Sequence, residues 1–121
     1  MTSRAPTNFI DIGGIRMDLL QAMEVRHSVR SYLDRPIEGI VKNDLSAFLE
    51  RCNRESGLHL QLILDEPTAF DSTLAHYGKF CNVRNYIAVV GPKGPALAET
   101  CGYYGEKVVL YAQALGLNTC W

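Results

Sequence analysis

The residues from Glu99 to Leu117 place the strongest constraint on how this 121-residue chain folds. Their spacing predicts a helix whose apolar side chains spread round more than half of its surface, among them Val108, Val109, Tyr111, Ala112 and Leu115. Glu106 and Lys107 are the last charged residues in it. A helix this apolar is buried on most sides, and in a small domain that favours packing against a second subunit. Gly116 is the predicted stop signal, followed by Leu117 as in a Schellman ending.

A second amphipathic helix is predicted after Pro36, a residue that favours a turn or a helix start. Its apolar positions recur at helical spacing: Ile37, Ile40, Val41, Leu45, Phe48, Leu49 and Cys52. Gly57 is a suitable residue to end it. The alternating segment Leu58–Leu64 and the continuously apolar segment Tyr86–Gly91 predict two strands with buried faces. This order of helices and strands predicts an α+β or α/β fold in a single domain, residues 1–121.

The N-terminal part of the chain carries a shorter helix signal. Asp18 and Gln21 are spaced as a capping box for a helix that should end near Val25 or Arg26. The residues before it, 1–14, are expected to form a loose or extended arm.

Charge and composition exclude several classes of protein. The formal net charge is -1 and 47% of the residues are apolar, whereas nucleic-acid-binding proteins carry a basic excess or stripe. No apolar run is long enough to span a bilayer, and the N-terminal residues lack the apolar segment of a secretory signal. We therefore expect a cytoplasmic protein without membrane contact. The cysteines and histidines are isolated along the sequence, so we expect no metal site and four reduced, mostly buried thiols.

The short segment MEVRHSVRSY collects hydrogen-bond donors although the chain has no excess of basic residues. In an extended backbone Arg26, Ser28 and Arg30 share one face. Two guanidinium groups and a hydroxyl that converge on one point suit a phosphate, because charge-assisted hydrogen bonds contribute about 1.5 to 3 kcal/mol each. The alternative is a solvated loop whose arginines pair with Glu24 and Asp34.

Three segments together resemble the nitroreductase family of flavin enzymes: RHSVRSYLDRPI, NYIAVVG and CGYYGEKVVLYAQALGLNTCW. They occur in the family's order and cover most of the chain from Met23 to Trp121, and the last is most similar to a compact branch of the family. The resemblance implies an α+β fold with a mixed sheet flanked by helices and a long central helix in the core of a homodimer. Because relatives continue beyond the segment that matches TCW, this chain is expected to be only the N-terminal part of the fold, truncated after Trp121.

The same resemblance implies a set of site residues. Arg26, Ser28 and Arg30 would contact the phosphate of FMN, and His27 would lie alongside. The flavin would be bound at the subunit interface, with the helix Gly105–Leu115 packed against the partner subunit. No side chain is expected to act as a catalytic acid or base, because in these enzymes the flavin carries the redox chemistry.

The family motif that touches the ribityl chain and the flavin ring is missing from its usual place before the first strand. Gln61 is the candidate replacement, with Asn53 as a second choice; the alternative is that Gln61 is an ordinary outward-facing strand residue. Lys79 is a candidate for positive charge near the N1/O2 edge of the flavin, against the alternative of an ordinary surface lysine.

The implied reaction is a ping-pong exchange. NAD(P)H passes a hydride to the flavin and leaves, and a small electron-poor acceptor such as a nitroaromatic or a quinone then takes the electrons. The chain is thus expected to be an FMN-dependent NAD(P)H nitroreductase. The alternative is a truncated flavin-binding or dimerisation module without turnover. A nucleic-acid or phosphoprotein reader is a weaker third hypothesis, because the chain lacks a second basic stripe.

Overall fold

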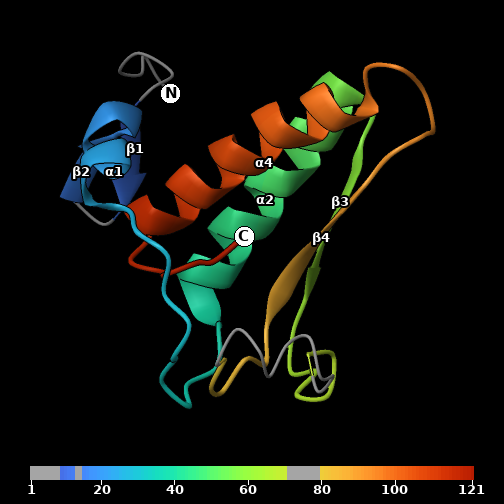
Figure 1. Cartoon of the computed structure of the whole chain (residues 1–121). Coiled ribbons are helices and arrows are strands. Elements are labelled where there is room, and N and C mark those ends of the chain that lie inside the picture. Colours follow the sequence, from blue (N-terminus) through green and yellow to red (C-terminus); the bar gives the residue numbers. More distant parts are fainter. Residues whose placement is uncertain (1–8, 13–14, 71–79) are drawn as a thin grey trace.

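The computed structural model describes residues 9–12, 15–70 and 80–121. Its elements in chain order are β1 (Phe9–Ile12), β2 (Ile15–Asp18), α1 (Leu19–Val25), α2 (Gly39–Ser56), β3 (His59–Ile63), β4 (Tyr86–Val90) and α4 (Leu97–Ala114). Helices α2 and α4 lie side by side, the pair β3–β4 runs along one side of them, and β1, β2 and α1 gather at the C-terminal end of α4 (Figure 1). Helices and antiparallel strand pairs occupy separate parts of the chain, which confirms the predicted α+β class.

The hydrophobic core lies between α2, α4 and the strand β3. Its most buried side chains are Leu45, Phe48, Leu49, Cys52, Leu58, Leu60, Val108 and Leu115. Phe48 of α2 stacks on Tyr111 of α4, with ring centroids 4.0 Å apart and an interplanar angle of 7°. The four buried residues of α2 all belong to the apolar set from which this helix was predicted. Each large apolar side chain buried here contributes about 1.5 to 3 kcal/mol.

The predicted ends of α1 and α2 are confirmed. At α1 the Asp18 carboxylate accepts a hydrogen bond from the Gln21 backbone N–H at 2.7 Å. The Gln21 side chain in turn accepts from the Asp18 N–H at 3.0 Å, which completes the capping box. Helix α2 ends at Gly57, whose φ of 76° lies in the left-handed region that glycine adopts without strain.

The end of α4 sets the course of the C-terminal segment. Gly116 has a φ of 87° and its N–H donates to the Gln113 carbonyl at 3.0 Å. The N–H of Leu117 donates to the Ala112 carbonyl at 2.9 Å. These two bonds form the predicted Schellman ending, and they turn residues 117–121 back over the helices (Figure 1).

The strands pair differently from the expected mixed sheet. Among the described residues β1 pairs with β2 and β3 with β4, and both pairs are antiparallel. Parallel pairing occurs in the described parts of the chain as two isolated bridges, Ser28 with Thr119 and Ser31 with Cys81. The parallel component of the sheet is therefore short, and it lies at the donor-rich segment.

The N-terminal arm is more ordered than expected. Of the two predicted alternatives, loose or extended, residues 9–12 take the extended one: they form strand β1 and pair with residues 15–18 of β2, with Ile12 opposite Ile15. The sequence FIDIGGIRMD held the signal, since two alternating runs separated by Gly-Gly are typical of a hairpin. The rest of the expected arm, residues 1–8 and 13–14, lies outside the described residues.

Most of helix α4 is covered within the chain itself. Val109 is 8% exposed and Ala112 is 2% exposed. Helix α1, with Ala22 fully buried, packs against α4 on a side that α2 leaves open. The apolar surface that favoured a second subunit is therefore largely buried inside one chain, so burial of α4 by itself does not require a partner.

The described residues were compared with the predictions on membrane spans, metal sites and thiols. None of their helices is long and apolar enough to cross a membrane. No group of three His, Cys, Asp or Glu side chains in the described ranges is placed to hold a metal ion. All four cysteines are free thiols, but the prediction that most are buried is wrong: Cys52 is buried, Cys101 and Cys120 are half-buried, and Cys81 is exposed.

Candidate phosphate-binding site

The donor-rich segment, residues 26–32, is an extended strand-like stretch held between two distant parts of the chain. On one edge the Val29 N–H donates to the Thr119 carbonyl at 3.0 Å. On the other edge the Cys81 N–H donates to the Arg30 carbonyl at 2.8 Å. Because both neighbours run parallel to it, the segment is the middle of three aligned backbone stretches.

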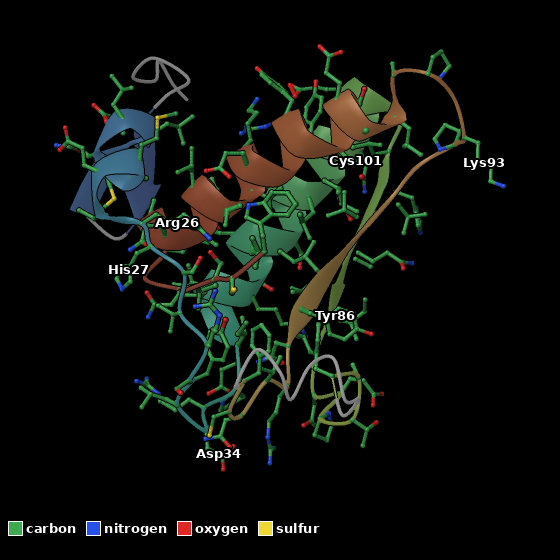
Figure 2. All side chains as sticks on the ribbon, viewed as in Figure 1. Arg26, His27, Asp34, Tyr86, Lys93 and Cys101 are labelled. Carbon is green, nitrogen blue, oxygen red and sulfur yellow. The ribbon has the colours of Figure 1, made fainter. Side chains whose placement is uncertain are left out.

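The extended backbone places the predicted donors on one face. Arg26, Ser28 and Arg30 alternate with residues that point the other way, as expected for an extended chain. Ser28 and Arg30 are exposed, whereas Arg26 is half-buried. Figure 2 shows Arg26 where α1 ends, beside the C-terminal segment. The segment is thus extended, as the predicted common face of the three donors requires.

Arg26 is the most constrained of these donors. Its Nε donates to the Thr119 Oγ1 at 3.2 Å. One of its terminal nitrogens, Nη2, is buried and has no hydrogen-bond partner among the described residues. A buried donor on a charged group that lacks a partner costs free energy. An anionic oxygen at this nitrogen would satisfy it, so the arrangement suits an anionic ligand.

The alternative, in which the arginines of this segment pair with Glu24 and Asp34, does not occur among the described residues. Asp34 pairs with Arg84, whose Nε lies 3.3 Å from the Asp34 Oδ1. Arg84 also reaches Asp65, at 3.5 Å. In the described part of the chain no ion pair joins Arg26 or Arg30 to an acidic side chain. Within the described residues their charges are therefore not paired with a carboxylate.

Tyr32 is a further member of this cluster that the sequence analysis missed. Its hydroxyl donates to the Val29 carbonyl. Burial raises the pKa of Tyr32 and the Cys120 thiol raises it further, whereas the Arg30 and Arg26 guanidinium groups lower it. Both arginine charges therefore act on one phenol. The signal in the sequence was the two-residue alternation, which continues from the donors to position 32.

The match to a known family covers this segment. A family model described as "Putative TM nitroreductase" matches residues 18–121. The chain belongs to this nitroreductase family. Neither the curated proteins nor the solved structures gave a match. Membership gives the chain a general oxidoreductase role and confirms the family that the sequence motifs indicated.

A flavin is the cofactor typical of nitroreductases, and the donors present fit its phosphate end. The buried, unpartnered Nη2 of Arg26 and the exposed Ser28 and Arg30 supply hydrogen-bond donors of the kind that bind phosphate. Among the described residues these three positions would hold the phosphate group.

The remaining predicted residues are not gathered at this place. Gln61 is an exposed residue of β3, and its Nε2 lies 2.8 Å from the His59 Nε2 on the same face. Strand β3 and the segment that follows α1 stand apart in Figure 1. Asn53 is fully used in the fold, because its amide accepts from the Leu60 N–H at 2.7 Å and donates to the Leu60 carbonyl at 3.1 Å. Within a single nitroreductase chain Gln61 is therefore separated from the phosphate donors.

His27 and Lys79 are the two remaining predicted residues. His27 is exposed, and its Nδ1 lies 3.2 Å from the Val25 carbonyl oxygen, to which it can donate. It lies next to Arg26 along the chain (Figure 2), and successive residues of an extended segment point to opposite faces. Lys79, the candidate for charge near the flavin ring, lies outside the described residues.

Proposed function

We propose that this nitroreductase-family chain is an FMN-dependent oxidoreductase. Arg26, Ser28 and Arg30 hold the FMN phosphate, NAD(P)H donates a hydride, and a small electron-poor acceptor such as a nitroaromatic or a quinone is reduced in a ping-pong sequence. Family membership supports the oxidoreductase class. A cytoplasmic location remains a prediction from the sequence.

One observation carries the proposal. The Nη2 of Arg26 is a buried cationic donor without a partner among the described residues, on an extended segment that also carries two exposed donors. Leaving such a donor unsatisfied is costly, and a dianionic phosphate would satisfy it while bonding to the neighbouring hydroxyl and guanidinium. Loose surface arginines would not be expected to bury a terminal nitrogen in this way.

The side chains bind and orient rather than react. FMN, when bound, supplies the redox chemistry. The backbone of residues 26–32 is held on both edges, so the three donors are presented from a fixed strand rather than from a loose loop. No side chain is proposed as a catalytic acid or base.

The proposed enzyme is a homodimer in which α4 contributes through its exposed side chains, because the predicted contact stretch Gly105–Leu115 is itself covered within one chain. Large side chains that stay exposed in the single chain support this proposal. Tyr103 of α4 is 61% exposed, and Leu20 and Met23 of α1 are 64% and 55% exposed. Apolar groups of this size on neighbouring elements are typical of an interface.

A flavin titration tests the proposal. FMN binding is followed by the quenching of flavin fluorescence, in the unmodified chain and in the double variant Arg26→Ala, Arg30→Ala. We expect the double variant to lose at least about tenfold in affinity, because each charge-assisted hydrogen bond is worth about 1.5 to 3 kcal/mol. Lys93→Ala is the control, since this exposed cation lies on the turn at the far end of the strand pair (Figure 2). Equal losses in the control and the double variant would refute a phosphate site at the arginines.

The second candidate is a flavin-binding module without turnover. The contact of Gln61 with His59 on β3 favours it, because the described chain then supplies donors for the phosphate but no predicted contact for the ring. Adding NAD(P)H to the flavin-loaded protein without oxygen separates the two candidates. Loss of the yellow flavin absorbance supports the enzyme, and an unchanged spectrum supports the binding module.

A further inference from the structure

The indole ring of Trp121 rests on the backbone of α4 at Gly105. A Cβ added to Gly105 would meet the Trp121 Cζ2 at 2.9 Å and the Cη2 closer still, so a side chain there would displace the ring. The indole Nε1 donates to the Glu106 Oε2 at 3.1 Å. The Trp121 side chain is nevertheless 63% exposed. These two contacts, rather than enclosure in the core, fix the position of the ring.

Thr119 lies between two anchored points of the same segment. On its N-terminal side Leu117 is bonded to the last turn of α4, and on its C-terminal side Trp121 is seated on Gly105. Thr119 uses both its side chain and its backbone on the donor segment: the Oγ1 accepts from the Arg26 Nε at 3.2 Å, and the carbonyl accepts from a backbone N–H at 3.0 Å. The position of the ring and the orientation of the guanidinium are therefore linked through two residues of chain.

We infer that Gly105 and Trp121 form a clip that positions Arg26 for phosphate binding. The seated indole holds Thr119 in place, and Thr119 holds one edge of the guanidinium so that Nη2 faces the ligand. This inference rests on the proposed function for the identity of the ligand, and on the Arg26–Thr119 contact for its geometry. Gly105 and Trp121 contact no ligand in this arrangement; they are positioning residues.

The energetic argument turns on the freedom of a long side chain. An arginine loses rotamer entropy when it is fixed, so a guanidinium that is already held binds an anion more tightly than one that must first be ordered. Thr119 is the hydrogen-bond partner of Arg26 among the described side chains. If Trp121 leaves Gly105, the segment loses its C-terminal anchor and the guanidinium is released toward solvent.

Two glycines of α4 provide a matched comparison. A Cβ added to Gly102 would meet nothing within 4 Å, whereas one added to Gly105 would strike the indole. Both substitutions to alanine favour the helix by the same intrinsic propensity. A loss of function in Gly105→Ala that is absent from Gly102→Ala therefore reports on the ring and not on the helix. Trp121→Ala removes the ring without relying on a clash. It therefore tests the role of the ring even if Gly105→Ala folds poorly.

Binding is measured for FMN and for riboflavin, which lacks the phosphate. We expect Gly105→Ala and Trp121→Ala each to weaken FMN binding about tenfold, the value of one charge-assisted hydrogen bond, and to leave riboflavin binding unchanged. Gly102→Ala should bind both as the unmodified chain does. The double variant of Gly105 and Trp121 should lose no more than either single variant, because both act through one contact. Unchanged FMN affinity, or equal losses for FMN and riboflavin, would overturn the inference while leaving the proposed function standing.

A measurement without flavin keeps the two proposals apart. The Arg26 Nε–H, bonded to Thr119, should be protected from solvent exchange in the NMR spectrum of the unmodified chain and of Gly102→Ala. Its protection should be lost in Gly105→Ala and in Trp121→Ala. If the unmodified chain bound no FMN, the proposed function would fail, and this protection would still decide whether the clip positions Arg26. Retained protection in both variants would refute the clip.

Discussion

At the scale of single residues, Arg26 has two tasks that need different parts of its guanidinium. The Nε is bonded to Thr119, and Nη2 is the buried donor, unpartnered among the described residues, that the proposed phosphate would satisfy. Lysine keeps the charge but has a single nitrogen, so it cannot do both. We expect Arg26→Lys to weaken FMN binding about tenfold, nearly as much as Arg26→Ala, in a fluorescence titration. Arg30→Lys, at an exposed position of the same face, should lose less. Full affinity in Arg26→Lys would show that charge alone is enough.

A pH effect is expected at Tyr32. Burial raises the pKa of Tyr32 and the Cys120 thiol adds to this, while the two arginines act in the opposite direction. The folded phenol therefore keeps its proton to higher pH than the unfolded one, whose pKa is about 10. Above about pH 10 the unfolded state has lost this proton and the folded state still holds it, so the free energy of unfolding falls as pH rises.

Tyr32→Phe tests the sign of that effect. Without the phenol, the loss of stability between about pH 8 and about pH 11 should be smaller than in the unmodified chain, as measured by urea unfolding at each pH. All other tyrosines are common to the two proteins, so their contributions cancel in the difference. Parallel pH profiles would show that Tyr32 titrates alike in the folded and unfolded states.

The residues of the site could be predicted only as far as local spacing reaches. Arg26, Ser28 and Arg30 were grouped because alternate residues of an extended chain share a face. Thr119, the partner of Arg26, is 93 residues away in sequence, and no local pattern points to it. Tyr32 continues the same alternation, so its place beside these donors could have been predicted in the same way. The prediction of the site was therefore limited by contacts between residues far apart in sequence, and not by the chemistry of the residues.

At the scale of elements, the signals that predicted correctly are those contained within one element. The capping box of α1, the apolar stripe of α2 and the Schellman ending of α4 each depend on residues a few positions apart. The strands β3 and β4 were also predicted, but their antiparallel pairing depends on how the chain reverses between them. The pair β1–β2 was not predicted, although two alternating runs separated by Gly-Gly are typical of a hairpin.

The packing of α2 gives a stability prediction with an internal control. Leu45 is 1% exposed in the core, whereas Ile40, on the first turn of the same helix, is 75% exposed. Leu45→Ala should lower the free energy of unfolding by about 2 to 5 kcal/mol, since it leaves a cavity between α2 and α4. Ile40→Ala removes a side chain of the same size from a solvated site and should change it by about 0.5 kcal/mol or less. Urea denaturation measures both, and similar losses in the two variants would mean that α2 presents a different face to the core.

At the scale of the whole molecule, the candidate site is assembled from three parts of the chain that are far apart in sequence. The donor segment 26–32 lies between Cys81 and Thr119, so the site forms only when the N-terminal, middle and C-terminal parts have all folded. The α+β class could be predicted from the order of elements, because that order depends on local signals. The arrangement around the donors could not, because it depends on contacts between all three parts. The family match over residues 18–121 spans all of them.

The proposed homodimer is the last prediction, and the burial pattern of α4 decides how to test it. Val109 and Ala112 are buried inside one chain, so a charge at either position should unfold the chain and would reveal nothing about a partner. Tyr103 lies on the same helix and is 61% exposed, so Tyr103→Glu should leave the fold intact. We expect the unmodified protein to sediment at twice the mass of one chain, and Tyr103→Glu at the mass of one chain with an unchanged circular dichroism spectrum. Leu33→Glu, which adds the same charge at a 74% exposed loop position, should remain a dimer. Two outcomes would remove α4 from the interface: a monomeric unmodified protein, or a dimer that tolerates Tyr103→Glu but is lost in Leu33→Glu. The reason is that an exposed aromatic side chain at a packed contact cannot be replaced by a charge without loss of association.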